Sequence, residues 1–429
     1  MPRLAGVALI AVLVAACGST VPPVSPSPSP TASPSATPTA EPTPASSATP
    51  ASSTEVDAIY DAIEDQVVAI RGLEPERDVT RRVIDETELR TMITEQFDEE
   101  TPPAYVAANE RLYKALGLIP ADADLRDLTL DLLSGGVAGF YRKDQNTLYI
   151  VSRTGLPGVN ERITFAHEYD HALQDQNTSV FTDQDGILDQ TDRILARQAV
   201  YEGDATLLMT LWSVENFDLS DLAELLALSN DPETAALLEG MPAILRETLL
   251  FPYTTGLTFV QGFQVQGGWS AVNELYDRMP TSTEQILHPE AYAANETPVA
   301  VELPDDLAKE LGTGWSVGLE DTLGELQLGI WLREAGVSDD ASATAAAGWG
   351  GDRLAVYNGP DDAWAVVVDT RWDNARDATE FADAAQSAVD GLDDPAQLST
   401  VADQNVMILI ASDEETLLEI DVLMGGTGV

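Results

Sequence analysis

Two of the three histidines in this 429-residue chain lie in one short stretch, TFAHEYDHALQDQ, at residues 164–176. On a helix of about 100° per residue, His167, His171 and Glu168 lie within about 100° of one another, and the apolar side chains face the other way. Two imidazoles four residues apart can bind one metal ion, and the adjacent glutamate can deprotonate a water there. The stretch therefore predicts a zinc site with Glu168 as general base and with Asp175 orienting an imidazole. The alternative is a surface helix with two solvated histidines.

A catalytic zinc ion usually has three protein ligands and one open position. The pattern HExxHxxGxxH is excluded, because Gln174 and Asn177 occupy the positions of its glycine and last histidine. Glu202, in RQAVYEGDATLLM, is the candidate third ligand. It lies in a stripe of small and apolar residues, where a carboxylate is costly unless it is paired or bound to a metal. Asp204 is the rival ligand, and an ordinary surface acid is the other interpretation of Glu202.

HEYDH followed downstream by YEGDA resembles the gluzincin branch of zinc metallopeptidases. With STEQILHPEAY and GWGGDRLAVY, these stretches are similar to a family of bacterial and archaeal surface-anchored predicted metallopeptidases over residues 120–375. The resemblance implies Zn²⁺ as the cofactor, with His167, His171 and Glu202 as its ligands and Glu168 as the base. It also implies a peptide or protein substrate.

The third histidine, His288, lies in STEQILHPE. In gluzincins a downstream His or Tyr often donates a hydrogen bond to the oxyanion, so the resemblance makes His288 a candidate catalytic residue. Tyr292 and Tyr253 are the alternatives for this role. The structural interpretation is a helix cap at residues 282–284 with His288 at the end of that helix.

The N-terminus indicates export and anchoring. Residues 1–16 combine one basic residue with an apolar run that suits a signal peptide and is too short to span a bilayer. The sequence VAAC resembles the bacterial lipobox, so Cys17, the single cysteine, is predicted to anchor the protein to the bacterial cell membrane through a lipid. The alternative is an ordinary secretory signal. Residues 17–55, rich in Ser, Pro, Thr and Ala, predict a disordered stalk outside the cytoplasm.

The charge balance excludes one class of partner. The chain has 72 acidic and 22 basic residues, which gives a net charge of −50. Such a surface repels nucleic acids and anionic lipid headgroups, so neither is expected to bind the folded part.

Four elements are predicted to position the site. Two strands in VAGFY and TLYIVS, at 137–141 and 147–152, form a hairpin directly before the histidine helix. Asn160 is the predicted N-cap of that helix, and Glu202 lies on a second long helix at 189–212. Because edge strands can bind extended peptides, the hairpin residues Phe140 and Tyr141 are predicted to line a cleft or, equally, to be sheet core.

These elements predict an α+β fold. Residues 56–119 predict a helical lead-in region, and 120–330 a mainly helical, zincin-like catalytic domain with a small antiparallel sheet. Residues 331–429 predict an α+β region with strands at RLAVYN, AWAVVVDT and VMILIAS. We expect a membrane-anchored zinc peptidase. The alternatives are a zincin fold without turnover and a cell-envelope binding lipoprotein.

Overall fold

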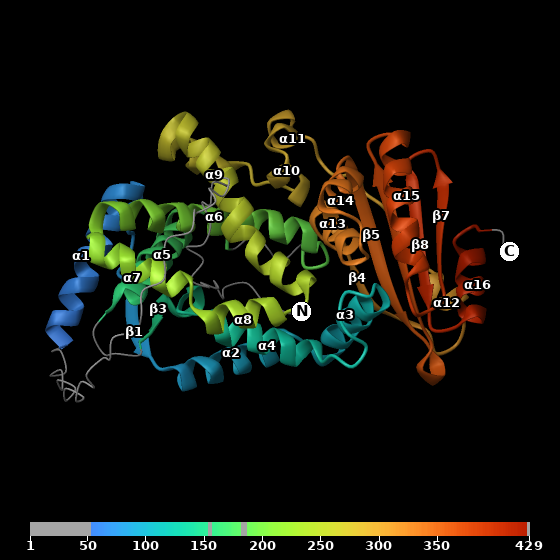
Figure 1. The fold of residues 1–429 in the computed structure, drawn as a ribbon, viewed down its shortest axis with the longest axis horizontal. Helices are drawn as coiled ribbons and strands as arrows, with labels where there is room; N and C mark the ends of the chain where they lie inside the picture. Colours follow the sequence, from blue (N-terminus) through green and yellow to red (C-terminus); the bar gives the residue numbers. More distant parts are fainter. Residues whose placement is uncertain (1–52, 153–156, 182–186, 427–429) are drawn as a thin grey trace, which may run out of the picture.

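The computed structural model of the protein describes residues 53–152, 157–181 and 187–426. The molecule is elongated, with α1 near one end and the C-terminal sheet at the other (Figure 1). It has the predicted α+β fold. The predicted signal peptide, Cys17 and all of the predicted stalk before Ser53 lie outside the described residues. Within the described ranges, no helix is both long and apolar enough to cross a membrane.

The part of the chain that carries the histidine helix combines a small sheet with long helices. Its elements are α1 (Ser53–Arg71), β1 (Thr80–Ile84), α2 (Glu86–Glu100), α3 (Pro103–Ala115), α4 (Leu125–Gly136), β2 (Gly139–Arg142), η1 (Lys143–Gln145), β3 (Thr147–Val151), α5 (Val159–Asn177), α6 (Thr191–Asn216), α7 (Leu219–Ser229), α8 (Pro232–Gly240), α9 (Ala243–Asp277), α10 (Thr283–Leu287) and α11 (Pro289–Ala294).

The C-terminal part is a sheet covered by helices. Its elements are α12 (Leu307–Glu310), β4 (Ser316–Asp321), α13 (Gly324–Glu334), α14 (Asp339–Ala346), β5 (Trp349–Asn358), η2 (Pro360–Asp362), β6 (Trp364–Trp372), α15 (Ala375–Asp390), β7 (Ala396–Ala402), β8 (Asn405–Ala411) and α16 (Glu414–Leu423).

The small sheet is mixed, with strand order β1-β3-β2. The predicted hairpin is confirmed, since β2 and β3 pair antiparallel, but β1 pairs parallel to β3. The helical prediction for the lead-in region, residues 56–119, was wrong over Thr80–Ile84. This segment extends because β3 offers it a row of backbone partners, and the helix begins only after Asp85, which caps α2 by accepting from the Glu88 amide. The lead-in region thus shares a sheet with the predicted catalytic region.

Helix α5 is buried on all sides. It begins at Val159 rather than after the predicted cap Asn160, because Glu161 accepts a hydrogen bond from the Gly158 amide. Its apolar face packs on α1, where Phe165 stacks on Tyr60 at 4.4 Å between ring centroids. Its polar face is buried as well and lies against α6.

Helices α6 and α9 approach each other very closely. A Cβ atom at Gly203 would lie 2.4 Å from the Gly256 carbonyl oxygen, and one at Gly256 would lie 2.4 Å from the Ala199 carbonyl oxygen. Only glycine fits at both positions. This contact fixes the register of the two helices and brings the N-terminal half of α9 over the histidines.

The C-terminal sheet is antiparallel, with strand order β4-β5-β6-β8-β7. Alternate residues of its strands face two separate cores: one contains residues of α13 and α15, and the other contains residues of α12 and α16. The three strands predicted here are confirmed, whereas β4 and β7 were not foreseen. Strand β4, which begins at Ser316, belongs to the same sheet because it pairs with β5, although it precedes the region predicted at 331–429.

Candidate metal centre

The two histidines of α5 and one glutamate of α6 point their side chains at a common centre. His167 Nε2 lies 2.9 Å from His171 Nε2, and both nitrogens lie 3.2 Å from Glu202 Oε2. The ligand atoms of the three residues all lie within 4.8 Å of one another. The structure therefore brings together the three residues that the sequence nominated as ligands.

The separations of these atoms suit a small tetrahedral ion. With metal–ligand bonds of about 2.0–2.1 Å, two ligand atoms of a tetrahedral site lie about 3.3–3.4 Å apart. The observed 2.9 and 3.2 Å separations need only a small widening. Two imidazoles and one carboxylate are also the donor set of one class of catalytic zinc site.

The three side chains are withdrawn from solvent. His167, His171 and Glu202 are 0, 2 and 4 % exposed, so the interpretation of α5 as a surface helix with solvated histidines was wrong. Burial disfavours the charged forms, but the two imidazoles outweigh it for Glu202 and lower the pKa of its carboxyl to about 2. Burial also opposes protonation of His171, yet Glu202 raises its pKa to about 10. For His167 burial prevails and lowers the pKa to about 4.

Glu168 is a buried carboxylate without a hydrogen-bond partner. Its side chain is 0 % exposed, and neither of its oxygens has a partner within the described residues. Burial raises the pKa of Glu168 to about 8, against the opposing effects of His171 and the Tyr141 backbone amide. A native protein rarely leaves such a group unpaired unless the group has a ligand or a reaction to serve. The Tyr141 amide of the edge strand β2 lies near enough to this carboxylate to lower its pKa, but it does not reach the distance and angle of a normal hydrogen bond.

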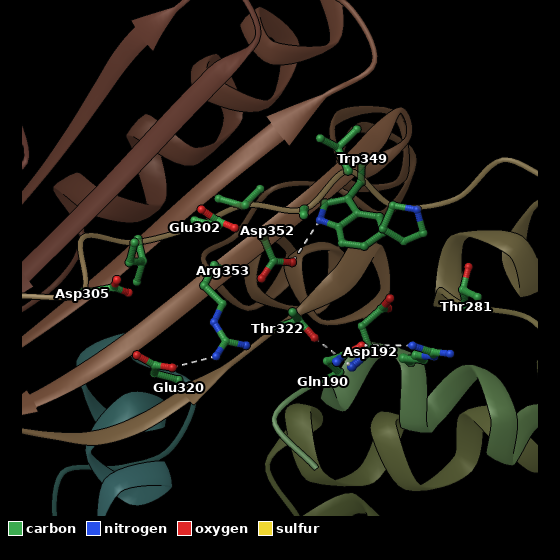
Figure 2. Close-up of a pocket in the computed structure, with 16 residues that line it drawn as sticks. Gln190, Asp192, Thr281, Glu302, Asp305, Glu320, Thr322, Trp349, Asp352 and Arg353 are labelled. Carbon is green, nitrogen blue, oxygen red and sulfur yellow. Dashed lines mark hydrogen bonds and ion pairs between the residues drawn. The ribbon is translucent and has the colours of Figure 1, made fainter. Parts of the chain in front are cut away.

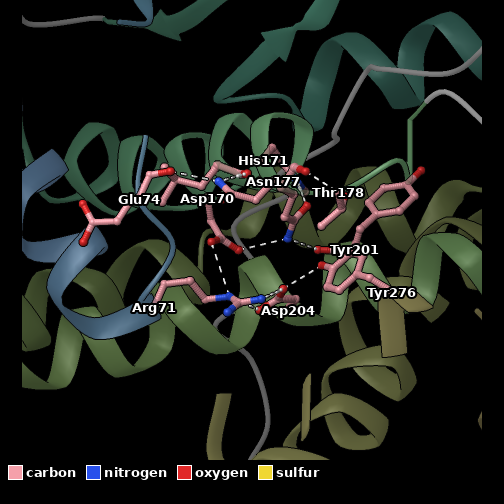
Figure 3. A network of polar contacts seen from close by, with 11 residues as sticks. Arg71, Glu74, Asp170, His171, Asn177, Thr178, Tyr201, Asp204 and Tyr276 are labelled. Atoms are coloured by element: carbon pink, nitrogen blue, oxygen red, sulfur yellow. Dashed lines mark hydrogen bonds and ion pairs between the residues drawn. The ribbon is translucent and has the colours of Figure 1, made fainter. Parts of the chain in front are cut away.

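Asp204 is not available as a metal ligand, because it belongs to a buried ion pair. Arg71, from α1, donates to both of its oxygens at 3.0 and 2.8 Å, and Tyr276 donates at 2.6 Å (Figure 3). Asp170 also lies near this guanidinium, with Oδ1 3.7 Å from Arg71 Nε. Asp204, the rival ligand, therefore holds Arg71 and Tyr276 in place, and Asp170 has a structural role in the same ion pair.

Gln174 links this ion pair to the histidines. Its amide nitrogen donates to Asp170 at 2.9 Å and to the Tyr201 carbonyl at 3.0 Å, while its oxygen lies 2.9 Å from His171 Nδ1. The imidazole is thereby oriented with Nε2 toward the centre. Asp175, predicted for this role, instead accepts from Arg77 and Tyr141.

Aromatic rings surround the two histidines. Tyr253 of α9 stacks over His167 with 6.2 Å between ring centroids, and Tyr201 and Phe181 lie 6.0 and 6.2 Å from the ring of His171. Tyr253 and Phe181 are half-buried, whereas Tyr201 is buried. Tyr253 therefore combines proximity to the centre with partial access to solvent.

His288 is not brought to this cluster. Its Nε2 contacts Glu325 Oε1 at 2.8 Å, and it ends α10 as the helix-cap interpretation predicted. Helix α10 is held by Asp192, ten residues and thus about 15 Å before Glu202 along α6. Tyr292 and Tyr253 are the two alternatives to His288 as the hydrogen-bond donor to the oxyanion. Tyr292 is buried and donates to the Arg278 carbonyl, so Tyr253 remains the candidate.

The hairpin side chains belong to the core rather than to an open cleft. Phe140 stacks on Tyr149, and the Tyr141 hydroxyl donates to Asp175. They are 2 and 4 % exposed. The sheet-core interpretation is confirmed, and what β2 presents toward Glu168 is its backbone.

A separate cavity of about 570 Å³ lies between the start of α6 and strand β5 (Figure 2). It is lined by polar groups such as Asp192, Asp352 and Arg353, and by no member of the histidine cluster. Asp352 accepts from the Trp349 indole, and Arg353 pairs with Glu320. These polar side chains already bond to one another, so we interpret the cavity as a gap at the contact between the two parts of the protein.

Comparison with known proteins identifies one domain only. Residues 316–421 match the profile of a domain of unknown function, DUF8575, which excludes the histidine cluster. No protein with a curated description matches the chain. Among solved structures, the chain is similar to a crystal structure from Chloroflexus aurantiacus of a protein proposed to be a hydrolase with a novel fold. The identity is 14 %, the TM-score is 0.37, and the match covers 56 % of this chain and 89 % of that chain. A likeness at this level indicates no shared activity.

Proposed function

We propose that the protein is an extracytoplasmic zinc-dependent peptidase, anchored to the bacterial cell membrane through a lipid on Cys17. The observation that carries this proposal is the convergence of His167 Nε2, His171 Nε2 and Glu202 Oε2 beside the unpartnered carboxylate of Glu168. Ligand atoms and a base in this arrangement suit hydrolysis of a carbonyl compound by water. The substrate is a peptide or protein, and nucleic acid is not a partner of this acidic chain.

Each residue of the site has one task in this proposal. His167, His171 and Glu202 hold the ion, which when bound acts as a Lewis acid and lowers the pKa of water at its open position. Glu168 takes a proton from the attacking water and passes it to the leaving amine nitrogen. Strand β2 is an edge strand of the small sheet in the described part of the chain, and its outer edge aligns an extended peptide beside Glu168.

Zinc binding can be tested by varying two proposed ligands, His167 and Glu202, with His288 as the control. Elemental analysis of the pure protein should find one zinc per chain. His167→Ala and Glu202→Gln should weaken zinc binding more than about 100-fold, beyond the effect of losing an outer hydrogen bond. His288→Gln should bind zinc normally, because His288 is paired with Glu325 instead. Equal zinc content in all four proteins would contradict the assignment.

Hydrolysis separates the enzyme from a zinc-binding protein without turnover. A peptide library should be cleaved by the zinc-loaded protein, left intact after chelation, and cleaved again when zinc is restored. Stoichiometric zinc without cleavage of any peptide would favour the inactive zincin-like alternative. Absence of zinc would favour the cell-envelope binding lipoprotein.

Tyr253→Phe should lower kcat by about 10²–10³-fold, the usual effect of removing one oxyanion donor. The variant keeps the ring that stacks on His167 and removes the hydroxyl alone. Zinc content and KM should change little. Tyr292→Phe is the matched control, since its hydroxyl donates to the Arg278 carbonyl away from the histidines and its loss should leave kcat unchanged. If the two variants have the same kcat, Tyr253 is not the donor.

A further inference from the structure

We propose that Glu284, Glu296 and Asp373 form a second metal site, which binds a calcium ion between α10 and the C-terminal sheet. One carboxylate oxygen of each residue lies within 4.8 Å of the other two. The site shares no residue with the histidine cluster, and the proposal does not depend on peptidase activity.

The three carboxylates come from three separate segments. Glu284 lies in α10, Glu296 follows α11, and Asp373 directly follows β6. Each segment is held in place by other contacts: Thr283 bonds to Asp192 through its amide and hydroxyl, and the Gln285 side chain donates to the Glu296 carbonyl. The Asp373 amide donates to the Gly348 carbonyl. The acids therefore meet because the fold places them together, and not through one flexible loop.

A glycine in the stretch GWGGD leaves room for one of these acids. A Cβ atom at Gly350 would lie 3.3 Å from Asp373 Oδ1, which is closer than ordinary van der Waals contact. The Gly350 carbonyl also accepts from the Val299 amide, so this strand end is tied to the segment that carries Glu296. The stretch singled out in the sequence thus shapes the second site rather than the histidine cluster.

Burial of an uncompensated carboxylate is the independent sign of a ligand. Glu284 is only 5 % exposed, and its carboxylate has no hydrogen bond or ion pair among the described residues. Glu325, also 5 % exposed, leaves its Oε2 without a partner among the described residues, and of the neighbouring charges it raises the pKa of Glu284 most. The site therefore has four carboxylates close together, those of Glu284, Glu296, Asp373 and Glu325. Among the described residues, the imidazole of His288 offsets part of their negative charge, and none of the four forms an ion pair with a lysine or arginine. Buried charges of this kind are normally paired or bound to a metal.

The donor set selects calcium. All the donors are carboxylate oxygens, which suit hard cations and not zinc. Three carboxylates on separate segments, two of them exposed, suit the flexible geometry and high coordination number of calcium better than the strict octahedron of magnesium. Water would complete the coordination at the exposed side. A bound ion would join α10 to the loop after β6 and so stabilise the contact between the two parts of the protein.

Calorimetric titration of the zinc-loaded full-length protein with CaCl₂ tests this proposal, at constant ionic strength so that general screening does not change. We expect one calcium per chain with a Kd of about 0.1–1 mM, as in extracellular calcium modules. Saturating calcium should raise Tm by several degrees, and magnesium should raise it less. Absence of calcium binding, or an equal response to magnesium, would overturn the assignment.

Conservative variants separate a metal site from a merely acidic surface. Glu284→Gln and Asp373→Asn should abolish the calcium-dependent rise in Tm. Asp383→Asn removes the same charge from an exposed position on α15 and should keep the full rise. Without calcium, the Tm of Glu284→Gln should equal or exceed that of the wild-type protein, because the substitution removes repulsion among buried carboxylates. A calcium response that survives in Glu284→Gln would refute the site.

Discussion

Glu168→Gln should lower kcat for peptide hydrolysis by about 10²–10⁴-fold, the range contributed by a general base, and leave one zinc per chain. Glutamine has nearly the shape of glutamate but cannot accept the proton of the attacking water. Because the side chain is not one of the three converging ligands, zinc affinity should not fall. Single-turnover kinetics and elemental analysis on the same preparation measure both quantities.

The same substitution should stabilise the metal-free protein by about 1–3 kcal/mol. Glu168 is fully buried and unpartnered within the described residues, so the native state bears the cost of desolvating its carboxylate. A neutral amide costs less at the same place. Urea unfolding of the chelated protein gives the free energy of unfolding. Lower activity combined with higher stability is the expected sign of a residue kept for chemistry.

Glu161→Gln is the matched control on the same helix. Glu161 is also buried, but it accepts a hydrogen bond from the Gly158 amide and caps α5. Its replacement should cost about 0.5–2 kcal/mol of stability and leave kcat unchanged. If Glu168→Gln behaved like this control, with loss of stability and full hydrolysis, both the assignment of the base and the account of its burial would be wrong.

The local part of the site was predictable because helix geometry alone creates it. His167 and His171 share a face through their four-residue spacing, and Glu168 lies at the edge of that face. The choice of Glu202 over Asp204 also follows from the helix, since residues two apart point in very different directions. Because Glu202 faces α5, Asp204 must point in another direction. There it meets Arg71.

The surrounding shell could not be predicted, because its members come from distant parts of the chain. Arg71 ends a helix that the sequence showed only as a periodic apolar pattern, and Tyr276 lies in the last turn of α9. Gln174 was within reach of prediction, since it follows His171 by three residues on the same face. Asp175 was predicted for this role instead, because a carboxylate is a common partner of a metal-binding imidazole.

The errors in the predicted fold have the same cause, since they also depend on contacts between distant parts of the chain. TRRVI has no local signal strong enough to separate it from the flanking helices, and it becomes a strand because β3 provides its backbone partners. His288 seemed informative because histidine is scarce in this chain, yet its partner Glu325 lies on α13 and could not be foreseen. The α+β class itself was predictable, because strand and helix periodicities are local.

Arg71→Met should destabilise the protein by about 3–5 kcal/mol, the cost of breaking a buried ion pair from one side. Arg71 is 1 % exposed, binds Asp204 through two hydrogen bonds, lies near Asp170, and packs its guanidinium over the ring of Trp269 at 4.6 Å. Methionine replaces the aliphatic stem but leaves two buried carboxylates facing each other. Urea unfolding should show the loss directly.

Arg77→Met provides the matched control. Arg77 also pairs with an aspartate of this region, Asp175 at 2.5 Å, but its side chain is 44 % exposed. Water screens such a pair, so its loss should cost less than about 1 kcal/mol. Adding Asp204→Asn to Arg71→Met should recover part of the stability, since it removes one of the stranded charges.

Zinc affinity shows whether the ion pair also positions the metal site. Arg71 holds Asp170, Asp170 accepts from Gln174, and Gln174 orients His171. Loss of an outer partner of a ligating imidazole typically weakens metal binding about 10–100-fold. Zinc should therefore be released from Arg71→Met at a correspondingly lower chelator concentration than from Arg77→Met. If the two variants released zinc at the same chelator concentration, Arg71 would stabilise the fold without orienting the ligands. A difference between them would mean that α1 reaches the metal through this chain of contacts, and that the lead-in region is part of the catalytic unit.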